Sequence, residues 1–280
     1  MSSFALAVIR IGIDPTAFHL GPIAIHWYGL FYVAAIIIGV EIARRYVTTF
    51  GANEDELWGF LPWAIGAGLL GGRLYYVVQN RQGYYLSNPE HILAAWEGGM
   101  AFFGAIGAVL IAAVIYARIN KISLLPMLDV AAIFAAVGQP IGRLGNIVNG
   151  DILGYETSLP WGTAYTHPDS FAPQLGVAYH PAAAYEIIAN LLLLGFLYVV
   201  LRRRRWPGLA ASLYLLGYSV TQFIVFFGRS NSIAALGLKQ AQLTAIVVFL
   251  LSLVLLRITY QLFRKRRTSE PDAAAVRPLT

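Results

Sequence analysis

Long stretches without charged residues alternate with short polar segments along most of this chain. Asp, Glu, Lys and Arg are absent from residues 15–40, 57–72, 98–117, 187–201, 206–228 and 240–256, and residues 124–141 contain only Asp129. A helix needs about 20 mostly apolar residues to cross about 30 Å of hydrocarbon. The pattern therefore predicts seven membrane-spanning helices, at about residues 22–42, 58–78, 97–117, 124–142, 182–201, 208–227 and 241–260.

The composition agrees with this pattern, since 58% of the 280 residues are hydrophobic and only 12% are charged. We therefore expect an all-α, polytopic membrane protein. Residues 1–267 would form a single membrane-embedded domain with an outer segment at about 143–181, followed by a disordered cytoplasmic tail at 268–280. No internal repeat is apparent.

Basic residues indicate the orientation of the chain. Most of the 20 Lys and Arg residues follow predicted spans one, three and five or lie near the C-terminus. Because cytoplasmic loops are enriched in Lys and Arg, the N-terminus should face outward and the C-terminus the cytoplasm. The remaining basic residues are Arg10, Arg73, Arg81, Arg143, Arg229 and Lys239.

The formal net charge of +6 is explained by this topology, and no soluble nucleic-acid recognition module accompanies it. The chain has no cysteine, so it offers no thiol nucleophile of its own. Metal-ligand motifs such as HExxH are also absent. We expect neither a cofactor nor a metal.

The segment 142–154, which reads GRLGNIVNGDILG, combines polar side chains and glycines at the end of an apolar span. A charged side chain at bilayer depth costs about 2.5–3.5 kcal/mol on insertion scales, so such groups usually have a function. The guanidinium of Arg143 is a planar donor well suited to phosphate. Asn146 and Asn149 would share one face of a helix. The segment predicts a site for an anionic head group at the membrane surface.

Other unusual polar residues are predicted to lie near the same, outer leaflet. They are Tyr28, Arg73, Glu97, His180, Tyr185, Glu186 and Arg229. Their clustering on one side favours a shared site over scattered anchors.

Five ordered motifs make the sequence resemble the prolipoprotein diacylglyceryl transferase family. The most specific is GRxGNxxNGxxxG at 142–154. The others are HisTrpTyrGlyLeu at 26–30, GlyArgLeuTyrTyr at 72–76, TrpGluGlyGlyMet at 96–100 and HisProAlaAlaAlaTyrGlu at 180–186. The resemblance extends from IleAspPro at 13–15 to AlaGlnLeu at 241–243 and so covers nearly the whole chain.

The resemblance implies a monomeric enzyme of the bacterial inner membrane with its site toward the periplasmic side. Such enzymes move a diacylglyceryl group from phosphatidylglycerol to the lipobox cysteine thiol of a preprolipoprotein signal peptide, and glycerol 1-phosphate is released. The residues expected to be catalytic are Tyr28, Arg143, Asn146 and Arg229. Those expected to bind substrate are Arg73, Glu97, Gly98, Gly99, Asn149, Asp151, Gly154, His180, Tyr185 and Glu186.

Three positions depart from the family pattern. Many members have a histidine, proposed as the base, where this chain has Phe103, and relatives often have glutamate where Val225 stands. Asp151 occupies a position that is usually glutamate. Deprotonation of the thiol must therefore use another group, the substrate phosphate, or the electropositive site itself.

Several alternatives remain open at this point. Asp129 could be a buried hydrogen-bonded group, and Arg73 could pair with Glu97 or Glu186 instead of binding lipid. His26 and His180 fit structural roles, whereas His91 and His167 have no partner pattern. Intramembrane Arg and Asp also occur in transporters. A non-catalytic lipid-binding protein is a third class.

Overall fold

The computed structural model describes residues 8–80, 82–94 and 98–269, and most of them are helical. The longer helices are α1 (Trp27–Tyr46), α2 (Glu54–Gln79), α4 (Phe102–Ile119), α5 (Leu124–Asn149), α6 (Ala182–Arg203), α7 (Leu209–Gly228) and α8 (Gln240–Ser269). The short helices are η1 (Thr48–Phe50), α3 (Gln82–Ser87) and η2 (Pro89–His91). The strands are β1 (Ile9–Ile11), β2 (Thr16–Leu20), β3 (Ile23–His26), β4 (Thr163–Tyr165), β5 (Ala178–Tyr179), β6 (Ile233–Ala235) and β7 (Leu238–Lys239).

Six of these helices, α1, α4, α5, α6, α7 and α8, are long and apolar enough to cross a membrane. They match six of the seven predicted spans, and the protein is accordingly a polytopic helical protein. The remaining prediction, 58–78, lies in α2, which has 26 residues but is not among the six. Arg73 and several glycines and aromatic residues lower its mean hydropathy. A seventh crossing and the orientation of the termini stay predictions.

The described chain divides into two compact units. The larger comprises the residues up to Arg45 together with those from Asp129 onward, and the smaller comprises Tyr46–Leu128. The single domain predicted over 1–267 stays a prediction. Most of the predicted tail at 268–280 lies outside the described residues, and α8 continues to Ser269.

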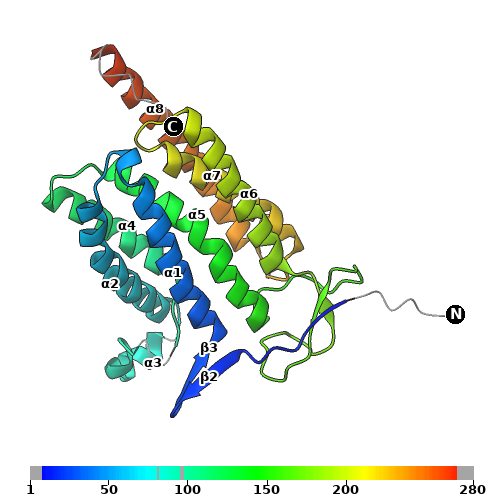
Figure 1. Ribbon diagram of the computed structural model, residues 1–280. Helices are drawn as coiled ribbons and strands as arrows, with labels where there is room; N and C mark the ends of the chain where they lie inside the picture. Colours follow the sequence, from blue (N-terminus) through cyan, green and yellow to red (C-terminus); the bar gives the residue numbers. More distant parts are fainter. Residues whose placement is uncertain (1–7, 81, 95–97, 270–280) are drawn as a thin grey trace. The chain divides into compact units, whose positions relative to one another are not determined.

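Close packing between helices of the larger unit depends on glycine. A Cβ added to Gly39 of α1 would lie 2.9 Å from the ring of Phe134 in α5, and one added to Gly217 of α7 would lie 2.3 Å from Leu193 in α6. Figure 1 shows α1 beside α5, and α6 beside α7. Small residues at such contacts let membrane helices approach closely.

The smaller unit is built in the same way around α2 and α4. A Cβ on Gly71 would lie 2.2 Å from that of Ala108, and one on Gly104 would lie 2.2 Å from that of Tyr75. Each glycine of one helix therefore receives a side chain of the other. The GlyGlyArg segment of α2 is thus a packing surface as well as a motif.

Short strands, which the all-α prediction did not include, lie outside the long helices. β1 pairs in parallel with β4, which pairs antiparallel with β5. Leu153, Tyr165 and Tyr179 form a small buried cluster near this sheet. The sheet ties the beginning of the described chain to the segment between α5 and α6.

Asp129 is a structural residue, as one of the two sequence interpretations held. Its side chain is 0% exposed, and its two oxygens accept from the backbone N–H groups of Gly208, at 2.6 Å, and Ala211, at 2.8 Å. These groups belong to the first turn of α7, where backbone donors have no partner within the helix. A carboxylate there also complements the positive end of the helix dipole.

Asp129→Ala should destabilise the protein, because two buried N–H groups lose their acceptor. Each costs about 1–3 kcal/mol when it is left unsatisfied. Asp129→Asn keeps one carbonyl acceptor and should lose less. Thermal unfolding in detergent measures both, and equal stability of Asp129→Ala and the wild-type protein would contradict this role.

Candidate functional site

Two arginines from distant segments meet on one buried carboxylate. Arg143 Nη2 lies 2.6 Å from Glu186 Oε2, and Arg229 Nη1 lies 3.1 Å from Glu186 Oε1. The Glu186 side chain is fully buried, while those of Arg143 and Arg229 are 22% and 13% exposed. The structure thus brings the two guanidinium groups to one carboxylate, and the prediction that they share a substrate site stays a prediction.

Each residue of this ion cluster lies near one end of a long helix. Arg143 is in the last two turns of α5, Glu186 is near the start of α6, and Arg229 directly follows α7. Burying charges is costly unless they are paired. One carboxylate offsets the repulsion between two guanidinium groups and leaves the cluster with a net positive charge. Burial lowers the pKa of Arg229, and Glu186 opposes that shift.

Asn146 and Asp151 extend the cluster. Arg143 Nη1 donates to Asn146 Oδ1 at 3.1 Å, and Asn146 Nδ2 donates to the two Asp151 oxygens at 3.0 and 3.2 Å. Asn146 is buried, whereas Asp151 is exposed. The Asp151 carboxylate therefore reaches Asn146 from the exposed end of this segment.

The helix α5 extends beyond its predicted end at residue 142, so that Arg143, Asn146 and Asn149 are helical. Gly150, with φ of 77°, ends the helix in a conformation that favours glycine. Tyr165 Oη donates to the carbonyl of Ile147 at 2.6 Å, and burial raises the pKa of Tyr165 to about 12, so it stays protonated. The end of α5 is thus held by the sheet segment.

Tyr28 of α1 lies against the same turn of α5. A Cβ added to Gly145 would lie 3.0 Å from Tyr28 Cα, and the rings of Tyr28 and Tyr32 are 4.6 Å apart. Gly145 therefore permits the approach that brings Tyr28 close to the polar segment. The sequence prediction placed Tyr28 in this site.

Gly154 lies beside the backbone of Arg229 and is hydrogen-bonded to His180. The N–H of Gly154 donates to the carbonyl of His180 at 2.8 Å, and Gly154 pairs with Arg229 in a β-bridge. His180 Nδ1 lies 3.1 Å from Tyr185 Oη, which accepts from Trp161 Nε1 at 2.9 Å. These contacts fit the structural interpretation of His180.

Arg73, Gly98 and Gly99 belong to the smaller unit. Arg73 is 3% exposed and donates to the carbonyls of His91, Ile92, Gly98 and Gly99. Its partners among the described residues are backbone oxygens, and the suggested pairing with Glu97 lies outside those residues. Gly98 and Gly99 have φ of 83° and 78°, and a Cβ on Gly99 would lie 2.3 Å from the Tyr76 ring. Glu97 lies outside the described residues.

The smaller unit also contains a cavity of about 420 Å³. Its lining residues are Arg73, Tyr76, Asn80, Tyr84, Tyr85, Gly98 and Gly99. Phe103, at the start of α4, is 49% exposed and lies with its ring 5.9 Å from that of Phe102. Neither phenylalanine can accept a proton.

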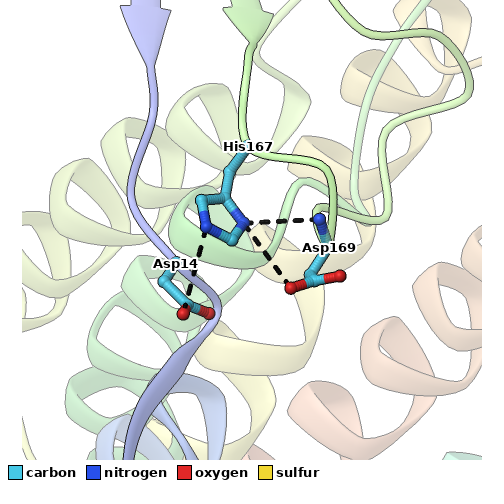
Figure 2. Close-up of side chains that lie close together, drawn as sticks. All are labelled: Asp14, His167 and Asp169. Carbon is cyan, nitrogen blue, oxygen red and sulfur yellow. Dashed lines mark hydrogen bonds and ion pairs between the residues drawn. The ribbon is translucent and has the colours of Figure 1, made fainter.

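A further cluster corrects the interpretation of His167 as a residue without partners. His167 Nε2 lies 3.9 Å from Asp14, and Nδ1 lies 4.0 Å from the Asp169 carboxylate and 3.3 Å from its backbone N–H (Figure 2). Their ligand atoms lie within 4.8 Å of one another. Both carboxylates are exposed, and His167 Nδ1 accepts from the backbone N–H of Asp169.

Sequence reasoning missed Lys239, which counted only as one of the outer basic residues. It is 5% exposed, and its Nζ donates to the carbonyls of Phe226 and Arg229. The sequence around Lys239, in strand β7, gave no local signal of this contact, because the acceptors lie at the end of α7.

Ten of the sequence-predicted site residues therefore lie in the larger unit, and Arg73, Gly98 and Gly99 lie in the smaller one. The ten are Tyr28, Arg143, Asn146, Asn149, Asp151, Gly154, His180, Tyr185, Glu186 and Arg229. Fold and site together define a multi-pass membrane protein with a buried, electropositive site near the ends of its helices.

Comparison with known proteins identifies the family. The family model for prolipoprotein diacylglyceryl transferase matches residues 15–258. A phosphatidylglycerol–prolipoprotein diacylglyceryl transferase of Rhizobium meliloti (strain 1021) is 36% identical over 229 residues, or 78% of this chain and 80% of that protein. The protein of the same name from Bordetella avium (strain 197N) is 34% identical over 255 residues, or 88% of this chain and 94% of that protein. This chain belongs to the prolipoprotein diacylglyceryl transferase family.

Gly154→Ala should distort this site. The added Cβ would lie 2.3 Å from the carbonyl oxygen of Gly228, next to Arg229, so the backbone must move. Overpacking of this kind costs about 1–3 kcal/mol. Gly195→Ala, in an open position of α6, is the matched control and should be neutral or stabilising. Equal unfolding temperatures for the two variants would refute the close-packing role.

Proposed function

We propose that this protein transfers the diacylglyceryl group of phosphatidylglycerol to the lipobox cysteine of preprolipoproteins. The observation that carries the proposal is the convergence of Arg143 and Arg229 on the two oxygens of Glu186. A phosphodiester offers the same combination of two oxygens and one negative charge. Glu186 and Asp151 balance the two arginines in formal charge, and the buried Lys239 on the Arg229 carbonyl makes the whole set positive, which favours an anion. The chain's family relatives are named for this reaction.

The reaction displaces phosphate from carbon. The cysteine sulfur attacks the glyceryl carbon of the lipid, a C–S bond forms, and the C–O bond to phosphate breaks with its electron pair on oxygen. Glycerol 1-phosphate leaves. Fixed cations in a water-poor site stabilise the charge that develops on the leaving oxygen. Arg143 and Arg229 have this role, and Glu186 keeps them side by side.

The thiol must lose its proton before or during the attack, because an ordinary thiol has a pKa near 8.5. Phe103 cannot accept that proton. The net positive charge of the cluster favours the thiolate, and a non-bridging phosphate oxygen of the lipid can receive the proton. In this proposal the deprotonation therefore needs no histidine at position 103.

The remaining polar residues orient the substrates. Asn146, Asn149, Asp151 and Tyr28 would bind the glycerol head group through hydrogen bonds. Gly154, His180, Tyr185 and Glu186 shape the wall beside Arg229. Arg73, Glu97, Gly98 and Gly99 stay proposed substrate-binding residues, with Arg73 acting through the backbone carbonyls of Gly98 and Gly99 that it binds.

In the cell we place the protein in the bacterial inner membrane as a monomer. The predicted excess of basic residues on one side puts the C-terminus in the cytoplasm and the N-terminus outside. With α2 as a seventh crossing, the ion cluster faces the periplasmic side, where preprolipoprotein signal peptides present their cysteine.

Arg143→Gln and Arg229→Gln should each lower transfer by about 100- to 1000-fold, the effect of removing one preorganised donor. The assay follows labelled phosphatidylglycerol and a lipobox peptide in detergent or vesicles. Arg257→Gln, an exposed arginine of α8, is the matched control and should remain near wild type.

The same assay separates the alternative classes. If the wild-type protein binds phosphatidylglycerol but does not lipidate the peptide, it is a non-catalytic lipid-binding protein. That class stays open because position 103 is phenylalanine, which cannot act as a base. Movement of a solute across sealed vesicles without lipidation would select a transporter.

Phe103→His tests whether that position borders the reacting sulfur. A histidine has a pKa near 6.5, so the neutral form that can accept a proton predominates only above about that pH. The variant should then gain rate between about pH 6 and 7.5 relative to the wild type. Phe102→His, one residue earlier on the helix, is the control. Unchanged pH–rate profiles in both variants would show that Phe103 only packs.

A further inference from the structure

The buried Lys239 side chain contacts the backbone of Arg229. Lys239 ends strand β7, and its Nζ donates to the carbonyl of Phe226 at 2.6 Å and to that of Arg229, with a longer contact of 3.4 Å to that of Phe227. Three acceptors match the three N–H donors of an ammonium group. Lys239 therefore uses its hydrogen-bonding capacity on the segment that carries Arg229.

These acceptors lie at the end of α7, where the carbonyl of Phe226 also accepts from the backbone N–H of Arg229 at 3.4 Å. The last carbonyls of a helix have no partner within it and form the negative end of its dipole. An ammonium group is the natural partner for them in a buried place. Without it, the carbonyls of Phe227 and Arg229 would lose this donor, and the backbone that follows α7 would be less firmly held.

Neighbouring residues hold Lys239 in this position. The backbone N–H of Lys239 donates to Gln242 Oε1 at 3.0 Å, and Gln242 Nε2 donates to the carbonyl of Phe223 at 3.2 Å. The Nζ also lies 4.9 Å from the centre of the Tyr155 ring, and the N–H of Tyr155 donates to the carbonyl of Gly228 at 3.2 Å. Gln242 and Tyr155 thus also donate hydrogen bonds to carbonyls near the end of α7.

The charge of Lys239 also changes the electrostatics of the site. Arg143 and Arg229 are balanced in formal charge by Glu186 and Asp151, all of which belong to the connected network. The ammonium of Lys239 leaves the whole set positive. An anionic phosphodiester would therefore enter a site with a favourable potential.

We propose that Lys239 is a positioning residue for Arg229. It fixes the last turn of α7 and the backbone of Arg229, so that the guanidinium stays beside Glu186 and can meet a lipid phosphate. The consequence for catalysis rests on the proposed function, whereas the consequence for anionic-lipid binding does not require that transfer occurs.

The test compares Lys239→Met with Lys239→Arg in purified full-length protein. Lys239→Met should lower kcat/KM for phosphatidylglycerol by about 10- to 100-fold, since a displacement of about 1 Å at a reacting group can cost about 100-fold. KM for the lipobox peptide should stay unchanged. Lys239→Arg keeps charge and donors and should recover most of the loss. Lys265→Met, an exposed lysine near the other end of α8, is the control and should match wild type.

A double-mutant cycle with Arg229→Lys distinguishes positioning from a general loss of folding. Phosphatidylglycerol binding in nanodiscs is measured for each variant beside transfer. If Lys239 acts through Arg229, Lys239→Met should weaken binding about 10-fold or more in the wild-type background and less than about 3-fold with Arg229→Lys. Equal losses in both backgrounds, or wild-type binding by Lys239→Met, would overturn the proposal. A wild-type protein that binds lipid but does not transfer it would overturn the proposed reaction alone.

Discussion

The pairing of two guanidinium groups with one buried carboxylate is the interaction on which the rest of the site depends. Arg143 and Glu186 lie in α5 and α6, and Arg229 directly follows α7, so their charges can be buried only if the ends of these helices meet. Because unpaired charges are very costly in a low-dielectric interior, this requirement fixes how those ends pack. The same requirement holds two guanidinium groups next to each other on the two oxygens of Glu186.

Helix α7 shows how the rest of the larger unit supports that interaction. Asp129 accepts from the N–H groups of its first turn, and Lys239 donates to the carbonyls of its last. A buried negative charge at the N-terminus and a buried positive charge at the C-terminus both complement the helix dipole. Each also satisfies backbone groups that no helix can satisfy itself. Both ends of the helix that presents Arg229 are therefore fixed by charged side chains from elsewhere in the chain.

The chemistry that follows relies on stabilising the leaving group. In the proposed reaction, the buried guanidinium groups of the larger unit would stabilise the departing phosphate. A site of this kind accelerates displacement by lowering the energy of the departing phosphate, and its positive potential favours the thiolate form of the incoming cysteine. Glycines such as Gly145 and Gly154 contribute by letting backbone and side chains approach the arginines.

The sequence by itself determined the helical membrane architecture, because apolar length is a local property that residue order displays directly. It also singled out Arg143 and Arg229 as candidate site residues, since charges beside long apolar spans are costly and therefore informative, and their role in the reaction stays a prediction. It did not indicate the short strands, the partners of His167, the carbonyl contacts of Arg73, or the position of Lys239. Only the tertiary structure decided these, because each depends on groups brought together from separate elements. The sequence shows that a charge is present near a membrane surface, whereas the fold decides which buried atoms it meets.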